Sequence, residues 1–206
     1  MKLSKISPGS YASNCYILSE DGEAVVIDPS AHPLSIIKPI MAEQLRLKAI
    51  LLTHGHFDHM LGLEYLRSAF PDVPVMIHAD DADMLSDGEK NASATLLGAP
   101  KEFAPPDKKL IAGDTIKLGR RTISLWHTPG HTKGSVCYQI GNLLFTGDTL
   151  MENGYGRCDL YGGDTEKMHY TILKLRTMSE KGSYMIYPGH GSSVKLSEAI
   201  FNIYNH

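Results

Sequence analysis

The sequence predicts a single α/β domain, spanning residues 1–206, in which layers of sheet and helix pack on one another. Three observations support this prediction. A length of 206 residues suits one domain. Hydrophobic residues make up 42% of the chain and charged residues 21%, which excludes a disordered chain. Strand and helix patterns occur in both halves, so two sheets face to face with helices outside, or one larger mixed sheet, would bury them.

The first half is predicted to form short strands joined by turns, together with two helices. Apolar residues cluster where strands are expected and recur every three or four positions where helices are expected. Pro39 falls within the first predicted helix, where it is tolerated only in the first turn because no N–H is needed there. The predicted strands are 2–6, 15–19, 24–28, 48–53 and 75–78, and the predicted helices are 35–45 and 60–69.

The second half begins with a polar, irregular stretch at 80–106, in which short helical pieces are expected at 82–86 and 92–97. A run of strands follows, with tight turns at Gly119 and at Gly141-Asn142. The predicted strands are 115–118, 122–127, 135–140, 143–146 and 184–187, and the predicted helices are 165–178 and 195–204.

Charge and composition exclude several classes of partner. Twenty Lys and Arg against 23 Asp and Glu give a net charge of −3, so we expect neither a nucleic-acid nor a membrane partner. No apolar run approaches the roughly 20 residues that cross a bilayer, and the first residues contain no apolar signal segment. Cys15, Cys137 and Cys158 show no C-x-x-C spacing and are expected to be reduced thiols. The expected location is therefore the cytoplasm.

Histidines and aspartates gather directly after the buried strand predicted at 48–53. His54 and His56 are two positions apart in extended backbone, so both side chains can point to the same side and reach one ion. Asp58 and His59 follow the bend and can address a second ion nearby. Imidazole and carboxylate groups are ligands that Zn²⁺ accepts. Four such groups would be costly to bury without a cation, which argues against a turn that binds no metal.

Three later turns each add one further candidate ligand next to a glycine, which lets the backbone turn sharply. These candidates are His131 in TPGHTKGS, Asp148 in FTGDT and His190 in YPGHG. Seven candidate ligands are enough for two divalent ions with positions left open for water. The remaining histidines lack this setting and are expected to have surface or core roles: His32, His78, His127, His169 and His206.

Two ions at such a centre would make a bridging hydroxide available near neutral pH and polarise a carbonyl or phosphoryl oxygen. Asp148 is the natural bridge because a carboxylate offers one oxygen to each ion. The predicted chemistry is hydrolysis of an activated acyl or phosphoryl group. No Ser-His-Asp arrangement or phosphate-binding glycine loop competes for this role.

The motifs THGHFDH, TPGHTKGS, FTGDT and YPGHG, in this order, resemble those of the metallo-β-lactamase superfamily, and SNCYIL and AVVIDPS extend the match over nearly the whole chain. The resemblance implies a four-layer αββα sandwich with the metals at one edge of the two sheets. It also implies two ions, with Asp148 between them and with Asp58 and Asp148 as catalytic residues. By the same resemblance, the first ion is held by His54, His56 and His131, and the second by Asp58, His59 and His190.

Within the superfamily the chain is most similar to short glyoxalase II-like proteins, which implies hydrolysis of a hydroxyacyl thioester such as S-lactoylglutathione. Asp148 argues against true β-lactamases, which have no bridging aspartate there. Glyoxalase II has a further helical region that contacts glutathione, whereas only 16 residues follow His190, so the thiol is open.

The segment GYGRCDLYGGD is similar to a stretch of these short proteins and supplies a candidate substrate-binding residue. Arg157 can hold a substrate carboxylate or carbonyl, or can instead brace the loop by pairing with Asp159. Cys158 can be reactive or an inert loop thiol.

Several alternatives share these ligands. They are a persulfide dioxygenase with a single iron, a lactone hydrolase, a phosphodiester or tRNA-processing hydrolase, and a metal-holding scaffold that is not an enzyme. Zn²⁺ is the favoured metal, and Fe or Mn also suits His and Asp. The expected partner is a small-molecule thioester, and the oligomeric state stays open.

Overall fold

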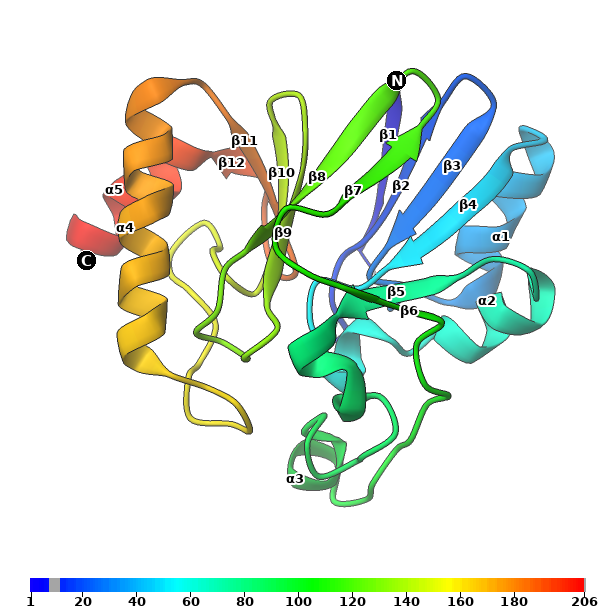
Figure 1. The fold of residues 1–206 in the computed structure, drawn as a ribbon, viewed down its shortest axis with the longest axis horizontal. Coiled ribbons are helices and arrows are strands. Elements are labelled where there is room, and N and C mark those ends of the chain that lie inside the picture. Colours follow the sequence, from blue (N-terminus) through cyan, green and yellow to red (C-terminus); the bar gives the residue numbers. More distant parts are fainter. Residues whose placement is uncertain (8–11, 206) are drawn as a thin grey trace.

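The computed structural model describes residues 1–7 and 12–205, which form two six-stranded mixed sheets. Figure 1 shows the sheets side by side, with α1 and α2 beyond one sheet and α4 and α5 beyond the other. The first sheet contains, in spatial order, β1 (Lys2–Ile6), β2 (Cys15–Glu20), β3 (Glu23–Ile27), β4 (Arg46–Leu51), β5 (Val75–His78) and β6 (Lys108–Leu110). The second contains β12 (Val194–Lys195), β11 (Met185–Pro188), β10 (Leu143–Gly147), β9 (Val136–Ile140), β8 (Arg121–His127) and β7 (Thr115–Leu118).

Alternating side chains of the strands create the layers. On β2, Tyr16 and Leu18 face the second sheet and join a core with Ile123 and Phe145, whereas Cys15 and Ile17 face the helices. Two further cores lie under the helices, one beneath α1 (Pro33–Ala42) and α2 (Leu63–Ala69) and one beneath α4 (Thr165–Lys181) and α5 (Leu196–Asn205). The layers are therefore helix, sheet, sheet and helix, which confirms the expected αββα sandwich.

The predicted elements occur with shifted ends, and two strands were not predicted. β6 and β12 have only three and two residues, too few for an alternating pattern to be recognised. The helix expected at 60–69 begins only at Leu63, as α2, because its N-cap Gly62 donates its N–H to the Pro29 carbonyl; η1 (Phe57–His59) precedes it and was not predicted. The irregular stretch contains η2 (Ala79–Met84) and α3 (Ser93–Leu97).

Pro39 corrects one expectation, because it lies in the interior of α1 rather than in its first turn. The ring removes one helical hydrogen bond. Ile36 and Ile40, one on each side of it, are fully buried against the first sheet, and this packing offsets the lost bond. Among the described residues, no helix is both long and apolar enough to span a bilayer.

Candidate metal centre

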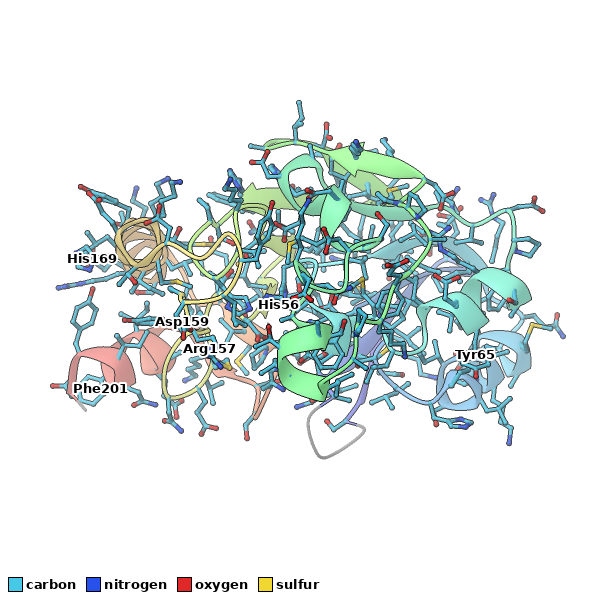
Figure 2. The ribbon with its side chains drawn as sticks, turned by 90° about the horizontal axis from the view of Figure 1, so that it is seen from below. His56, Tyr65, Arg157, Asp159, His169 and Phe201 are labelled. Atoms are coloured by element: carbon cyan, nitrogen blue, oxygen red, sulfur yellow. The ribbon has the colours of Figure 1, made fainter. Side chains whose placement is uncertain are left out.

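The seven predicted ligands meet at one end of the sandwich, in the loops that follow strands of both sheets. His54 and His56 follow β4, and Asp58 and His59 belong to η1, directly after them. From the second sheet, His131 comes from the β8–β9 loop, Asp148 follows β10 and His190 follows β11. Figure 2 shows His56 near the middle of the molecule, between the halves that carry the two sheets.

The first group consists of His54, His56 and His131, which are all buried. His131 Nε2 lies 2.9 Å from His56 Nδ1 and 3.2 Å from His54 Nε2. Burial and the neighbouring imidazoles lower the pKa of His54 well below its ordinary value and that of His56 to about 3. These two rings are therefore neutral at pH 7 and can each offer a lone pair.

The hydrogen bonds made by the Nδ1 atoms of His131 and His54 indicate that these nitrogens carry protons. His131 Nδ1 donates to the carbonyl oxygen of Arg157 at 2.7 Å, and a carbonyl can only accept. Thr53 Oγ1 donates to Asp28, so it accepts from His54 Nδ1 at 3.2 Å. The Nε2 atoms of His54 and His131 face each other 3.2 Å apart, an arrangement that a cation between them would stabilise.

The second group consists of Asp58, His59 and His190. Asp58 Oδ2 lies 3.1 Å from His190 Nε2 and 3.7 Å from His59 Nε2. Burial alone would lower the pKa of His59, but the carboxylates of Asp28, Asp58 and Asp148 outweigh burial and raise it well above its ordinary range. The pKa of His190 is raised by its hydrogen bond to Asp58. The second group thus brings two imidazole rings with raised pKa values and one carboxylate close together.

Asp148 lies between the two groups. Its Oδ1 is 3.3 Å from His59 Nε2, and its Oδ2 is 3.6 Å from both His131 Nε2 and His190 Nε2. Burial alone would raise the pKa of Asp148, but His59, His131 and His54 outweigh it and hold the pKa well below the usual range. One ionised carboxylate therefore faces both groups, as a bridging ligand would.

Three orphaned polar atoms of the candidate ligands test whether cations fit here. His56 Nε2, His59 Nε2 and Asp148 Oδ1 are buried and make no hydrogen bond. Such groups are destabilising unless another partner satisfies them. Gly189 leaves room beside Asp148 and His59 because it has no side chain. A Cβ at this position would lie 2.2 Å from Asp148 Oδ1 and 2.6 Å from the His59 ring. The residues present thus fit a two-metal site, and the donor set does not specify which metal.

Two buried aspartates that the sequence analysis did not single out hold the ligands in place. Asp28 follows β3 with φ +50° and accepts hydrogen bonds from the Thr53 N–H at 2.8 Å, Thr53 Oγ1 at 2.7 Å and His59 Nδ1 at 2.9 Å. It therefore orients His59 with Nε2 toward the centre. Its sequence signal was its place in AVVIDPS, directly after a buried strand.

Asp81, in η2, connects the loops of the first group. Its carboxylate accepts from the Gly55 N–H at 3.0 Å, the Gly134 N–H at 2.7 Å and Thr132 Oγ1 at 2.6 Å. Gly55 separates His54 from His56, and Thr132 follows His131. Asp81 thus ties together loops from the two sheets. No local pattern could have revealed it, because its partners lie 26 to 53 positions away.

The loop after Asp148 contains an Arg157–Asp159 pair, which was one of the two alternatives for Arg157. Arg157 Nε and Nη2 lie 2.6 and 2.7 Å from the two Asp159 carboxylate oxygens, and Figure 2 shows both side chains next to each other before α4. Arg157 also lines the cavity beside the centre, so its substrate-binding role stays a prediction. Burial raises the pKa of the half-buried Cys158 thiol, which favours the inert reading of this residue.

The other histidines lie apart from the seven candidate ligands, and His206 is outside the described residues. His78 and His127 stack with their ring centroids 4.2 Å apart and their planes 11° apart, and with Asp80 they form a further group of possible ligands. Parallel rings direct their in-plane lone pairs side by side, so this stack does not converge on one ion. His169 is exposed on α4, away from the centre.

A cavity of about 580 Å³ opens beside the centre. Four of the candidate ligands line it: His56, Asp58, His131 and Asp148. Its walls come from α3 and from the loop that follows Asp148. A substrate in this cavity would lie against both proposed ion positions.

Comparisons with known proteins agree with this geometry. A family model described as the metallo-beta-lactamase superfamily matches residues 8–190. The chain is 35% identical, over 93% of its length and 90% of the relative's, to a Bacillus subtilis protein named "Probable metallo-hydrolase YqgX". It is 29% identical to the hydroxyacylglutathione hydrolase of Tolumonas auensis, over 89% of this chain but 63% of that protein.

Solved structures are similar over nearly the whole chain. A structure described as BLEG-1 B3 metallo-beta-lactamase has a TM-score of 0.86 and 34% identity, covering 96% of this chain and 95% of that one. A structure of TTHA1623 described as a di-iron-bound form has a TM-score of 0.80 and 29% identity, covering 95% of this chain and 96% of that one.

Proposed function

This chain belongs to the metallo-β-lactamase superfamily as a metal-dependent hydrolase, and we propose that it cleaves thioesters, with hydroxyacyl thioesters such as S-lactoylglutathione as first candidates. The observation that carries the proposal is the pair of imidazole Nε2 atoms, of His54 and His131, that lie 3.2 Å apart beside the ionised Asp148.

The proposed ligands follow the two groups. His54, His56 and His131 would hold one ion, Asp58, His59 and His190 the second, and Asp148 would contact both. When bound, two divalent ions make water nucleophilic near neutral pH and polarise a substrate carbonyl. Zinc is the proposed metal, and iron is the alternative that the di-iron form of TTHA1623 supports.

The chain's own residues then orient the substrate and move protons. Asp58 lines the cavity, and its pKa is lowered because His59 and the His190 hydrogen bond outweigh burial, so it is ionised and can accept a proton from the attacking water. Asp148 is the second catalytic carboxylate because it fixes the spacing of the two groups. The reaction consumes one water and yields a carboxylate, a thiol and one proton.

Metal analysis combined with a substrate panel tests the proposal. The purified chain is loaded separately with zinc, iron and manganese, and metal content and thiol release from S-lactoylglutathione are measured. We expect about two ions per chain and thiol release that a chelator abolishes. A fully loaded protein that releases no thiol from any thioester overturns the proposal.

β-Lactam hydrolysis is the second candidate: Asp148 argues against it, but the structure described as a B3 metallo-beta-lactamase is 34% identical to this chain. The panel therefore also includes a β-lactam, a lactone and a phosphodiester, and oxygen uptake with glutathione persulfide. Turnover of one of these without thioester cleavage would replace the thioester assignment with that activity.

A further inference from the structure

The cavity beside the metal centre has apolar walls. Outside the candidate ligands and the buried Phe57, most of its lining consists of large hydrophobic side chains: Leu96, Leu97, Met151, Tyr155 and Leu160. Leu96 is 52% exposed, Leu97 47% and Tyr155 43%. These side chains lie on two separate segments, α3 and the loop after Asp148, that face the same space. Apolar surface of this kind, open to a space that also holds reactive groups, is typical of a ligand-binding wall.

Charge is nearly absent from these walls. Arg157 is the one Lys or Arg that lines the cavity among the described residues, and Asp159 occupies two of its nitrogens. Lys90, on the neighbouring loop, is paired with Asp83 at 2.6 Å. Glutathione has two carboxylates and one ammonium group, and burying such charges without partners is costly. The described walls therefore suit an uncharged, apolar group far better than they suit glutathione.

From this placement we infer that the natural substrate carries an uncharged, apolar group next to the scissile carbonyl, and that this group lies between α3 and the Met151–Leu160 loop. The inference rests on the proposed function for the identity of the scissile bond. The apolar group belongs either to the acyl part or to the thiol part, and the two sources share one recognition chemistry, burial of CH₂ groups against leucine and tyrosine side chains.

Binding and turnover are measured separately to test this inference. For binding, the zinc-loaded protein is titrated with two non-hydrolysable thioethers, S-hexyl-N-acetylcysteamine and S-hexylglutathione. For turnover, kcat/KM is compared between lactoyl thioesters of N-acetylcysteamine and glutathione, and along an acetyl, butyryl and hexanoyl series on N-acetylcysteamine. We expect at least about tenfold tighter binding of the neutral thioether, and about fourfold higher kcat/KM for each added methylene on the side that occupies the cavity.

The acyl series and the comparison of the two thiols together identify whether the acyl part or the thiol part of the substrate carries the apolar group. A steep increase along the acyl series assigns it to the acyl part. A flat acyl series together with a strong preference for the neutral thiol assigns it to the thiol part. Equal or tighter binding of S-hexylglutathione, together with a flat acyl series, overturns the inference even if thioesters are hydrolysed. Preferred binding of the neutral thioether without any turnover overturns the proposed function alone.

Variants of the wall connect these results to named residues. Leu97→Lys adds a cation to the wall and should shift the binding preference toward S-hexylglutathione by about tenfold. Asp159→Asn releases Arg157 and should shift it in the same direction. The matched control is Leu34→Lys on α1, where the leucine is 52% exposed, close to the 47% of Leu97, but lies away from the cavity, and it should leave the preference unchanged. An equal shift of the binding preference in all three variants would overturn the assignment of α3 and the Met151–Leu160 loop as the binding wall.

Discussion

Asp28 accepts a hydrogen bond from His59 Nδ1 at 2.9 Å, and this contact decides which nitrogen of His59 points at the metal centre. Neither residue is near the other in sequence, since 31 positions separate them. The same carboxylate also receives two hydrogen bonds from Thr53, which directly precedes His54. Asp28 therefore positions residues of both groups without belonging to either.

Replacing Asp28 with asparagine should weaken metal binding more than it weakens folding. In Asp28→Asn the amide retains the size of the side chain but loses the charge that holds His59 Nδ1–H toward it and Nε2 toward the centre. We expect the affinity for the second ion to fall about ten- to hundredfold, as measured by competition with a chelating dye. The control is Asp72→Asn on the surface, which should bind metal like the parent protein. Unchanged affinity in Asp28→Asn would contradict the positioning role.

Metal binding should release a proton from His59. Without metal its pKa is raised well above the ordinary value, so the ring is protonated at pH 7, whereas a ligand nitrogen must carry a lone pair. Calorimetric titration of the metal-free protein in buffers of different ionisation enthalpy should show about one proton released with the second ion. The release should diminish as the pH rises through the raised pKa, because His59 is then already neutral. Release that increases with pH would contradict this assignment.

Asp81→Asn should destabilise the fold, because the new amide directs its own N–H groups at donors that the carboxylate now accepts from. Leaving buried donors unsatisfied costs about 1–3 kcal/mol, which urea unfolding would measure as a lower free energy of unfolding. The exposed neighbour provides the control, since Asp80→Asn should change stability by less than about 0.5 kcal/mol. A neutral Asp81→Asn would show that this carboxylate does not hold the loops.

His56→Ala and Asp148→Ala should each abolish turnover and lower the metal content while leaving the fold largely intact. Both residues lie in loops at the end of the sandwich rather than in its three cores. Elemental analysis, activity and circular dichroism would be measured together. His169→Ala, on the exposed face of α4, is the histidine control and should behave like the parent protein. Near-normal activity of either site variant would remove that residue from the centre.

Gly189→Ala should reduce metal content by steric hindrance alone. Its Cβ would lie 2.2 Å from Asp148 Oδ1, so the carboxylate would have to move away from its position between the two groups. Gly154→Ala is the matched control, because a Cβ there meets nothing within 4 Å. We expect metal-to-protein ratios to fall only in Gly189→Ala. Equal ratios in both variants would mean that the Asp148 position is not needed for binding.

The sequence by itself determined the features that short segments encode. Clusters of apolar residues between turn signals predicted most strands, and the histidines and aspartates in glycine-flanked turns predicted which side chains meet, because each turn places its ligand at the end of a buried strand. The order of four such motifs was enough to identify the superfamily. β6 and β12 were not predicted, since two or three residues at a sheet edge carry too little pattern.

Only the tertiary structure decided what depends on contacts between distant segments. Asp28 and Asp81 gain their roles from partners that lie 25 to 53 positions away. The apolar wall exists because folding places α3 across from the loop after Asp148, although neither segment alone has a binding pattern. The physical reason is that ligand type is a property of single residues, whereas orientation, burial and pocket shape arise only when separate loops pack together.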